Sequence, residues 1–274
     1  MKLKIGISPC PNDTFIFHAL LKHLIDVDTF EFETTFADVQ SLNEGAQAGD
    51  FDIVKISYGN LWNVQNRYGL LYSGGAMGYG CGPLLLSTKS NNLDPDIPVG
   101  VPGKNTTANA LLRFWAAGEN VTYKSEYAVF DELYQDLLNG NRIQSLVIHE
   151  NRFTYEQDGL HLICDLGEYW EKRTEAPIPL GGIVIRRDLD TDVARQVDGL
   201  IRRSVEFAWN NPEKSESFIK EHAQETEERV VKSHIGLYVN DFSAHMGDKG
   251  KIAIERLQQL IAPEFGDVKS LFAY

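Results

Sequence analysis

The stretch "KLKIGISPCPNDTFIFHALLKHLI", residues 2–25, decides how the chain begins to fold. Residues 2–8 predict a short strand in which two lysines interleave apolar side chains, and residues 14–26 have the apolar spacing of a helix. A strand followed directly by a helix is the first part of a βαβ unit. The beginning of the chain therefore predicts an α/β protein.

The loop inside this stretch is rich in residues that shape helix ends. Pro9 and Pro11 hold the backbone extended. Three residues follow that are able to cap the helix, namely Asn12, Asp13 and Thr14. A helix start whose remaining N–H groups are free suits an oxyanion or a carboxylate, although an ordinary capped turn has the same composition. Asn12 and Thr14 are therefore candidate substrate-binding residues.

The rest of the chain repeats strand and helix patterns. Residues 39–49 predict a short helix stopped at Gly49, and residues 58–68 predict another helix. Repeated βα units favour largely parallel sheets with helices on both faces. The polar, proline-marked residues 91–98 interrupt the pattern, which then restarts.

This restart predicts two domains with a central cleft between them. The C-terminal third is nearly all helix, and we expect it to return and cover the first sheet. The larger, discontinuous domain would comprise residues 1–92 and 180–274, with a smaller inserted α/β domain at 93–179. The segments expected to cross between the domains are residues 84–90 and 182–188.

The composition limits the classes of partner. The chain has 274 residues, 43% of them hydrophobic, and a formal net charge of −13. This acidity disfavours nucleic acid and anionic membranes as partners, and no apolar run is long enough to span a membrane. Three widely spaced cysteines favour reduced thiols and no metal site. With no secretory-signal pattern at its start, we expect a cytoplasmic protein.

Polar residues at strand ends are the candidates for a functional site, because ligands of open α/β sheets bind there. Ser57 follows one apolar strand, and Lys55 within that strand is expected to face the cleft or pair with a carboxylate. Thr106 and Thr107 open a helix after another strand, in a loop without the spacing of a P-loop. His149 ends a further strand, where a histidine, judged by its position alone, is more often structural than catalytic.

Two other features are weaker candidates. Cys10 could be a nucleophile at a helix start, but no His or Asp partner can be assigned to it, and a small residue with a structural role is the favoured interpretation. The glycine-dense residues 73–83 lead into a strand rather than a helix, which favours a loop near the cleft over a dinucleotide fingerprint.

Several motifs together carry a resemblance that covers nearly the whole chain. They are "SPCPNDTFIFHAL", "DIVKISYGN", "GYGCGPLLL", "VPGKNTTANALL", "VIHENRFTY" and "PIPLGGIVIRRDL". In these motifs the chain resembles the menaquinone-biosynthesis family of the futalosine route, which contains 1,4-dihydroxy-6-naphthoate synthase and chorismate dehydratase. "SPCPNDTF" is the segment that favours the synthase branch.

The resemblance implies a fold, an activity and a set of site residues. The fold is a two-domain fold like that of type II periplasmic binding proteins. The activity is a cofactor-free carbon–carbon lyase that converts cyclic dehypoxanthine futalosine, an aromatic carboxylate, to 1,4-dihydroxy-6-naphthoate. His149 would be the proton acceptor, and the substrate would be held by Lys55, Ile56, Ser57, Thr107 and Ala108.

Two alternatives stay open from the sequence. One is chorismate dehydratase of the same pathway. The other is a non-enzymatic soluble binding protein for a small carboxylate, in which His149 only hydrogen-bonds the ligand. The sequence does not indicate an oligomeric state.

Overall fold

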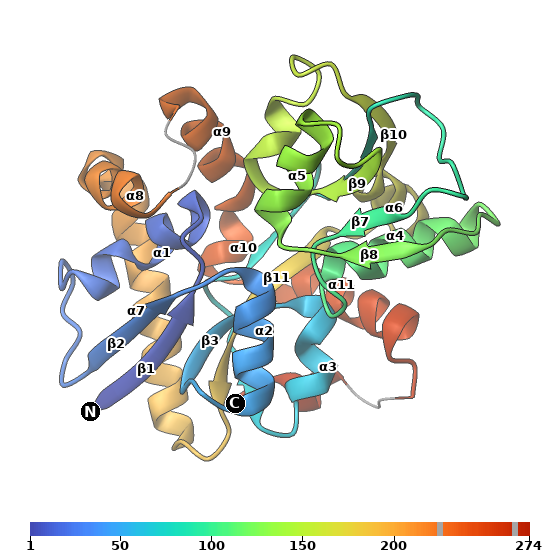
Figure 1. Cartoon of the computed structure of the whole chain (residues 1–274). Helices are drawn as coiled ribbons and strands as arrows, with labels where there is room; N and C mark the ends of the chain where they lie inside the picture. The colour runs from blue at the N-terminus through green and yellow to red at the C-terminus, as the bar shows by residue number, and fades with distance from the viewer. Residues whose placement is uncertain (224–226, 265–267) are drawn as a thin grey trace.

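Two β-sheets form the frame of the protein (Figure 1). The computed structural model describes residues 1–223, 227–264 and 268–274, and the side chains of Asp131, His149 and Glu150 lie outside the described part. The first sheet has the order β2-β1-β3-β11-β4, with β5 paired to β11. Its strands are β1 (Lys2–Ile7), β2 (Glu31–Phe36), β3 (Ile53–Ser57), β4 (Tyr68–Leu70), β5 (Ala76–Gly78) and β11 (Ile178–Arg186).

The second sheet is built from the middle of the chain and has the order β10-β6-β9-β7-β8. Its strands are β6 (Leu84–Ser87), β7 (Val99–Val101), β8 (Ser125–Tyr127), β9 (Gln144–Val147) and β10 (His161–Asp165). The α/β class predicted from the sequence is confirmed.

The sheets are mixed, so the prediction of largely parallel sheets was wrong. β1 runs parallel to β2 and β3, and β7 runs parallel to β8 and β9. The chain leaves the first sheet after β5 and enters the second at β6, and it returns through β10 and β11. Outgoing and returning strands lie side by side, with β5 beside β11 and β6 beside β10, so both pairs are antiparallel.

The chain passes between the sheets at residues 79–83 and 166–177. The sequence suggested residues 84–90 and 182–188 as the crossings. The first of these ranges begins with β6 of the second sheet, and the second lies mainly in β11 of the first sheet. The topology locates the crossings, and the division into domains at residues 92 and 179 stays a prediction.

Helices flank both sheets. The C-terminal helices α7 (Thr191–Asn210), α8 (Glu216–His222) and α9 (Glu228–Tyr238) pack against α1 (Pro11–Leu21), which confirms that the tail returns to the first sheet. Apolar side chains of β1, α1 and α7 form one core cluster there, among them Ile5, Phe17 and Ile201. The remaining helices are α2 (Val39–Ala48), α3 (Leu61–Val64), α4 (Thr107–Gly118), α5 (Phe130–Leu138), α6 (Leu166–Thr174), α10 (Asp241–Ala244) and α11 (Gly247–Ile261).

Single-turn helices complete the description. They are η1 (Tyr58–Asn60), η2 (His149–Phe153), η3 (Pro212–Ser215) and η4 (Val268–Leu271). Residues 58–68 therefore hold η1, α3 and the start of β4 rather than the single helix that was predicted. Within the described ranges, no helix combines the length and the apolar character needed to cross a membrane.

A glycine pair joins the two crossings. Gly82 lies in the first crossing, and Gly167 is the second residue of α6 in the second crossing. A Cβ on Gly167 would lie 2.7 Å from both the N and the Cα of Gly82. Real Cβ atoms essentially never approach another atom this closely. The two backbones can therefore touch only because both residues lack a side chain.

We expect Gly167→Ala to destabilise the protein by roughly 1–3 kcal/mol, because the backbone must shift to admit the new methyl group. Gly199→Ala is the matched control, since Gly199 lies in the exposed face of α7 with open space around its Cα. That change should stabilise by about 0.5–1 kcal/mol through helix propensity. Urea unfolding of both variants checks the prediction, which fails if Gly167→Ala is as stable as the wild type.

Candidate functional site

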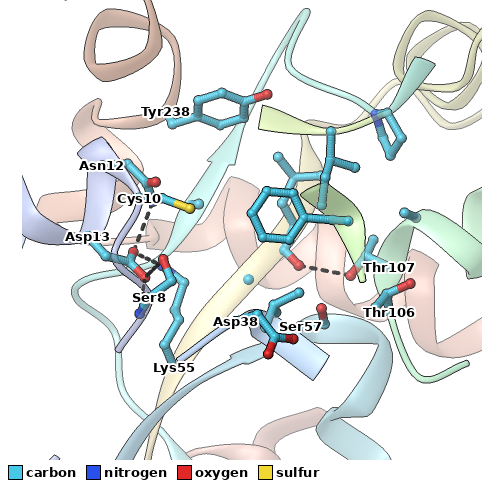
Figure 2. A pocket seen from close by; sticks show the side chains of 18 of the residues that line it. Ser8, Cys10, Asn12, Asp13, Asp38, Lys55, Ser57, Thr106, Thr107 and Tyr238 are labelled. Atoms are coloured by element: carbon cyan, nitrogen blue, oxygen red, sulfur yellow. Dashed lines mark hydrogen bonds and ion pairs between the residues drawn. The ribbon is translucent and has the colours of Figure 1, made fainter. Parts of the chain in front are cut away.

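A cavity opens where loops of the two sheets meet (Figure 2). Its volume is about 810 Å³ when the space open to solvent is included. Residues before and in the first turn of α1, the end of β3 and the start of α2 form one wall. The start of α4, the residue after β9 and the first crossing form the other. Of the predicted binding residues, the cavity is lined by Asn12, Lys55, Ile56, Ser57, Thr106, Thr107 and Ala108.

One wall of the cavity contains a buried ion pair between Lys55 and Asp13. Lys55 Nζ lies 2.6 Å from Asp13 Oδ1, and the two side chains are only 7% and 1% exposed. Lys55 was expected to face the cleft or to pair with a carboxylate, and in the structure it does both. Lys55 Nζ also lies 3.4 Å from the Gly74 carbonyl, so the third ammonium proton can be directed to a ligand.

Both carboxylate oxygens of Asp13 accept hydrogen bonds. Its Oδ2 accepts hydrogen bonds from the N–H and the hydroxyl of Ser8 at 3.2 and 2.8 Å. Its Oδ1 accepts from Asn12 Nδ2 at 2.9 Å and from Lys55. A carboxylate has about four acceptor positions, so all of them are occupied. Asp13 therefore serves to fix Lys55 rather than to take a proton from a ligand.

The start of α1 differs from the prediction that Asn12, Asp13 or Thr14 caps the helix. The helix begins at Pro11, and Cys10 is the N-cap residue without a side-chain hydrogen bond to the helix. Proline suits the first helical position because it has no N–H that would need a partner. The three polar residues are the second to fourth residues of the helix, and Asn12 and Asp13 line the cavity instead of capping the helix end.

The start of α4 forms the opposite side of the cavity, where Figure 2 shows Thr106 and Thr107 facing the Asp13 cluster. The Thr106 hydroxyl caps the helix by accepting from Asn109 N. The Thr107 hydroxyl donates to the Leu180 carbonyl at 2.8 Å and accepts from Gly59 N at 3.0 Å. Among the described residues, the N–H groups of Thr107 and Ala108 donate no hydrogen bond. These two N–H groups are therefore the donors that α4 can offer to an anion.

The chain is similar to known proteins both in sequence and in fold. The family model described as menaquinone biosynthesis matches residues 3–263. The chain belongs to the menaquinone-biosynthesis family.

Two curated relatives in this family are similar over nearly their whole length. A protein of Streptomyces coelicolor is 42% identical over 96% of this chain and 93% of its own, and one of Thermus thermophilus is 40% identical over 93% and 92%. Both carry the name "1,4-dihydroxy-6-naphtoate synthase".

Solved structures show the same fold. A crystal structure of an Archaeoglobus fulgidus protein is similar with a TM-score of 0.89 and 28% identity, over 96% of this chain and 97% of that one. The ligand-binding component of an ABC-type import system from Staphylococcus aureus is similar with a TM-score of 0.74 at 14% identity, over 99% and 96%. This second likeness shows the fold alone.

The family resemblance singled out His149, whose backbone opens η2 directly after Ile148. Ile148 lines the cavity, while the His149 side chain lies outside the described part. Thr14 is not brought to the cavity. Its side chain is completely buried and its hydroxyl donates back to the carbonyls of Cys10 and Pro11.

The structure adds cavity residues that the sequence did not suggest. Tyr238 at the end of α9 lines the cavity, as does Asp38, the N-cap residue of α2. Asn43 lies behind the wall, where its Oδ1 accepts from Ser57 N at 3.0 Å and holds the end of β3. An Asp before a helix pattern was a visible capping signal, whereas Tyr238 and Asn43 are ordinary helix residues in sequence.

Two cysteines of this family member face the cavity, Cys10 and Cys81. Burial raises the pKa of the Cys81 thiol to about 12, so Cys81 is not a thiolate at neutral pH. Among the described residues, no group of three or more His, Cys, Asp or Glu side chains could hold a metal ion.

Proposed function

We propose that this protein is a 1,4-dihydroxy-6-naphthoate synthase, a carbon–carbon lyase that converts cyclic dehypoxanthine futalosine to 1,4-dihydroxy-6-naphthoate in menaquinone biosynthesis. The observation that carries the proposal is the match of 40–42% identity over nearly the full length of two relatives of that name. The cavity supports it, because donors suited to an oxyanion and a carboxylate lie on two walls of a partly apolar space. We propose that the enzyme needs no cofactor and works in the cytoplasm.

The proposed chemistry assigns one task to each wall. Cleavage to a dihydroxynaphthalene needs a base to remove a proton next to a carbonyl, and donors to stabilise the resulting oxyanion. We assign the base to His149. The Lys55 ammonium, fixed by Asp13, would stabilise the oxyanion, and the N–H groups at the start of α4 would hold the substrate carboxylate together with Ser57.

Turnover by the purified protein tests this function. Incubation with cyclic dehypoxanthine futalosine should release 1,4-dihydroxy-6-naphthoate, measured by chromatography. Loss of chorismate without naphthoate would instead identify chorismate dehydratase. Binding of the naphthoate without turnover of either compound would identify a binding protein.

We expect Ser57→Ala to raise KM by about 5- to 150-fold, which corresponds to about 1–3 kcal/mol for a hydrogen bond to a charged oxygen. Ser57 lines the cavity at the end of β3 and is 5% exposed. Ser87→Ala is the matched control, because Ser87 ends β6, is 2% exposed and does not line the cavity. Equal KM values for the two variants would remove Ser57 from the substrate site.

A further inference from the structure

A completely buried histidine on α9 is connected to the Lys55–Asp13 pair. His234 is 0% exposed, and its Nε2 lies 3.0 Å from Asn12 Oδ1. Asn12 Nδ2 in turn lies 2.9 Å from the same Asp13 oxygen that Lys55 contacts. Four side chains thus form one chain of contacts from α9 to the cavity wall, although His234 and Asn12 are 222 residues apart in sequence.

The chemistry of the groups fixes the direction of these hydrogen bonds. The Asp13 carboxylate only accepts, so the Asn12 amide must present its NH₂ group to Asp13. The Asn12 carbonyl oxygen then faces His234, and Nε2 of His234 must carry the proton that it donates. Turning the Asn12 amide over would place its oxygen against the carboxylate. His234 is therefore a donor that supports this orientation of Asn12 from the side opposite Asp13.

We propose that His234 is a positioning residue: through Asn12 and Asp13 it holds the Lys55 ammonium at the place where the substrate oxyanion forms. This inference rests on the proposed function for the role of Lys55. A second contact of His234 must be separated from this path, because its ring also packs on Tyr238, with ring centroids 4.6 Å apart. Tyr238 lines the cavity one helical turn further along α9.

Replacing His234 tests the proposal. His234→Leu removes the donor, and we expect kcat to fall roughly 10- to 100-fold with KM changed less, by analogy with outer partners of metal ligands. His234→Gln keeps an N–H donor at a similar reach and should recover most of the loss. Rates are compared per folded molecule, with folding measured by circular dichroism.

A double-mutant cycle distinguishes the two contacts of His234. In an Asn12→Ala background the path to Asp13 is already broken, so His234→Leu should have little further effect on kcat. If the full effect persists in that background, His234 does not act through Asn12 and the proposal is wrong. It is equally wrong if His234→Leu keeps the wild-type kcat, or if His234→Gln is as slow as His234→Leu.

His18 provides the matched control. It is also a buried histidine, 6% exposed, whose Nδ1 lies 3.1 Å from Ser215 Oγ, and it does not line the cavity. His18→Leu should change stability but leave kcat per folded molecule unchanged, and an equal loss of kcat would show that any buried histidine has this effect. A wild-type protein that does not turn over the substrate contradicts the proposed function itself, whereas an active wild type with an insensitive His234→Leu variant contradicts only the positioning role.

Discussion

Replacing His149 by Asn should lower kcat by roughly 100-fold or more while the protein stays folded and still binds 1,4-dihydroxy-6-naphthoate. The reason is that a general base contributes about 10²- to 10⁴-fold to the rate, and an amide cannot accept the proton. Single-turnover kinetics together with product binding by calorimetry measure the two effects separately. Wild-type activity should also decline toward acidic pH, because only the neutral imidazole can act as the base.

His161→Asn is the control for this experiment. His161 is an exposed residue on β10 of the second sheet, the sheet whose strand β9 precedes His149. It does not line the cavity, so its replacement should leave kcat and binding unchanged. A purely structural role for His149 predicts a different pattern, in which stability or binding falls and kcat per folded molecule survives. A folded His149→Asn variant with near wild-type kcat would end the assignment of His149 as the base.

Replacing either Lys55 or Asp13 should lower the free energy of unfolding far more than replacing a residue of an exposed ion pair. Asp13→Asn leaves the Lys55 ammonium buried without its counter-charge, and Lys55→Met leaves the Asp13 carboxylate without its cation. Removing one partner of a buried ion pair costs about 3–5 kcal/mol, so we expect each variant to unfold at markedly lower denaturant concentration. Guanidinium unfolding followed by circular dichroism provides the measurement.

The surface pair of Lys2 and Glu33 is the matched control, with an N–O distance of 2.7 Å but side chains 64% and 52% exposed. Lys2→Met should cost at most about 1 kcal/mol, because water already solvates both charges. The double variant Lys55→Met/Asp13→Asn should lose less stability than the sum of the single changes, since no unpaired charge remains. A cost of Asp13→Asn as small as that of Lys2→Met would show that water reaches the buried pair.

The fold was predictable where sequence pattern and local chemistry agree. β2 is a clear period-two strand, and α2 ends at Gly49, which adopts a left-handed conformation with φ of 86°. β10 and α6 were not predicted from the sequence, although Asp165 before α6 caps the helix by accepting from the N–H groups of residues 167 and 168. β10 is mostly half-buried, so its apolar alternation is weak. Strand direction could not be predicted either, because it depends on which strands lie side by side.

The candidate site was predictable through one geometric rule, that ligands collect at the ends of strands beside helix starts. That rule placed Lys55, Ser57 and Thr107 on the cavity wall without any knowledge of the partner of each. The partners were not predictable, because Asp13 lies 42 residues before Lys55 and His234 lies 222 residues after Asn12. The contact of His234 with Asn12 arises only when the C-terminal helices return to α1.

The contact between Gly82 and Gly167 also bears on how the two sheets can move relative to each other. Two separate linkers would give the sheets independent pivots and several degrees of freedom. Here the crossings meet backbone to backbone at Gly82 and Gly167, so neither crossing can shift toward the other. Gly82 itself lines the cavity. The packing of two glycines therefore also fixes the position of one part of the cavity wall.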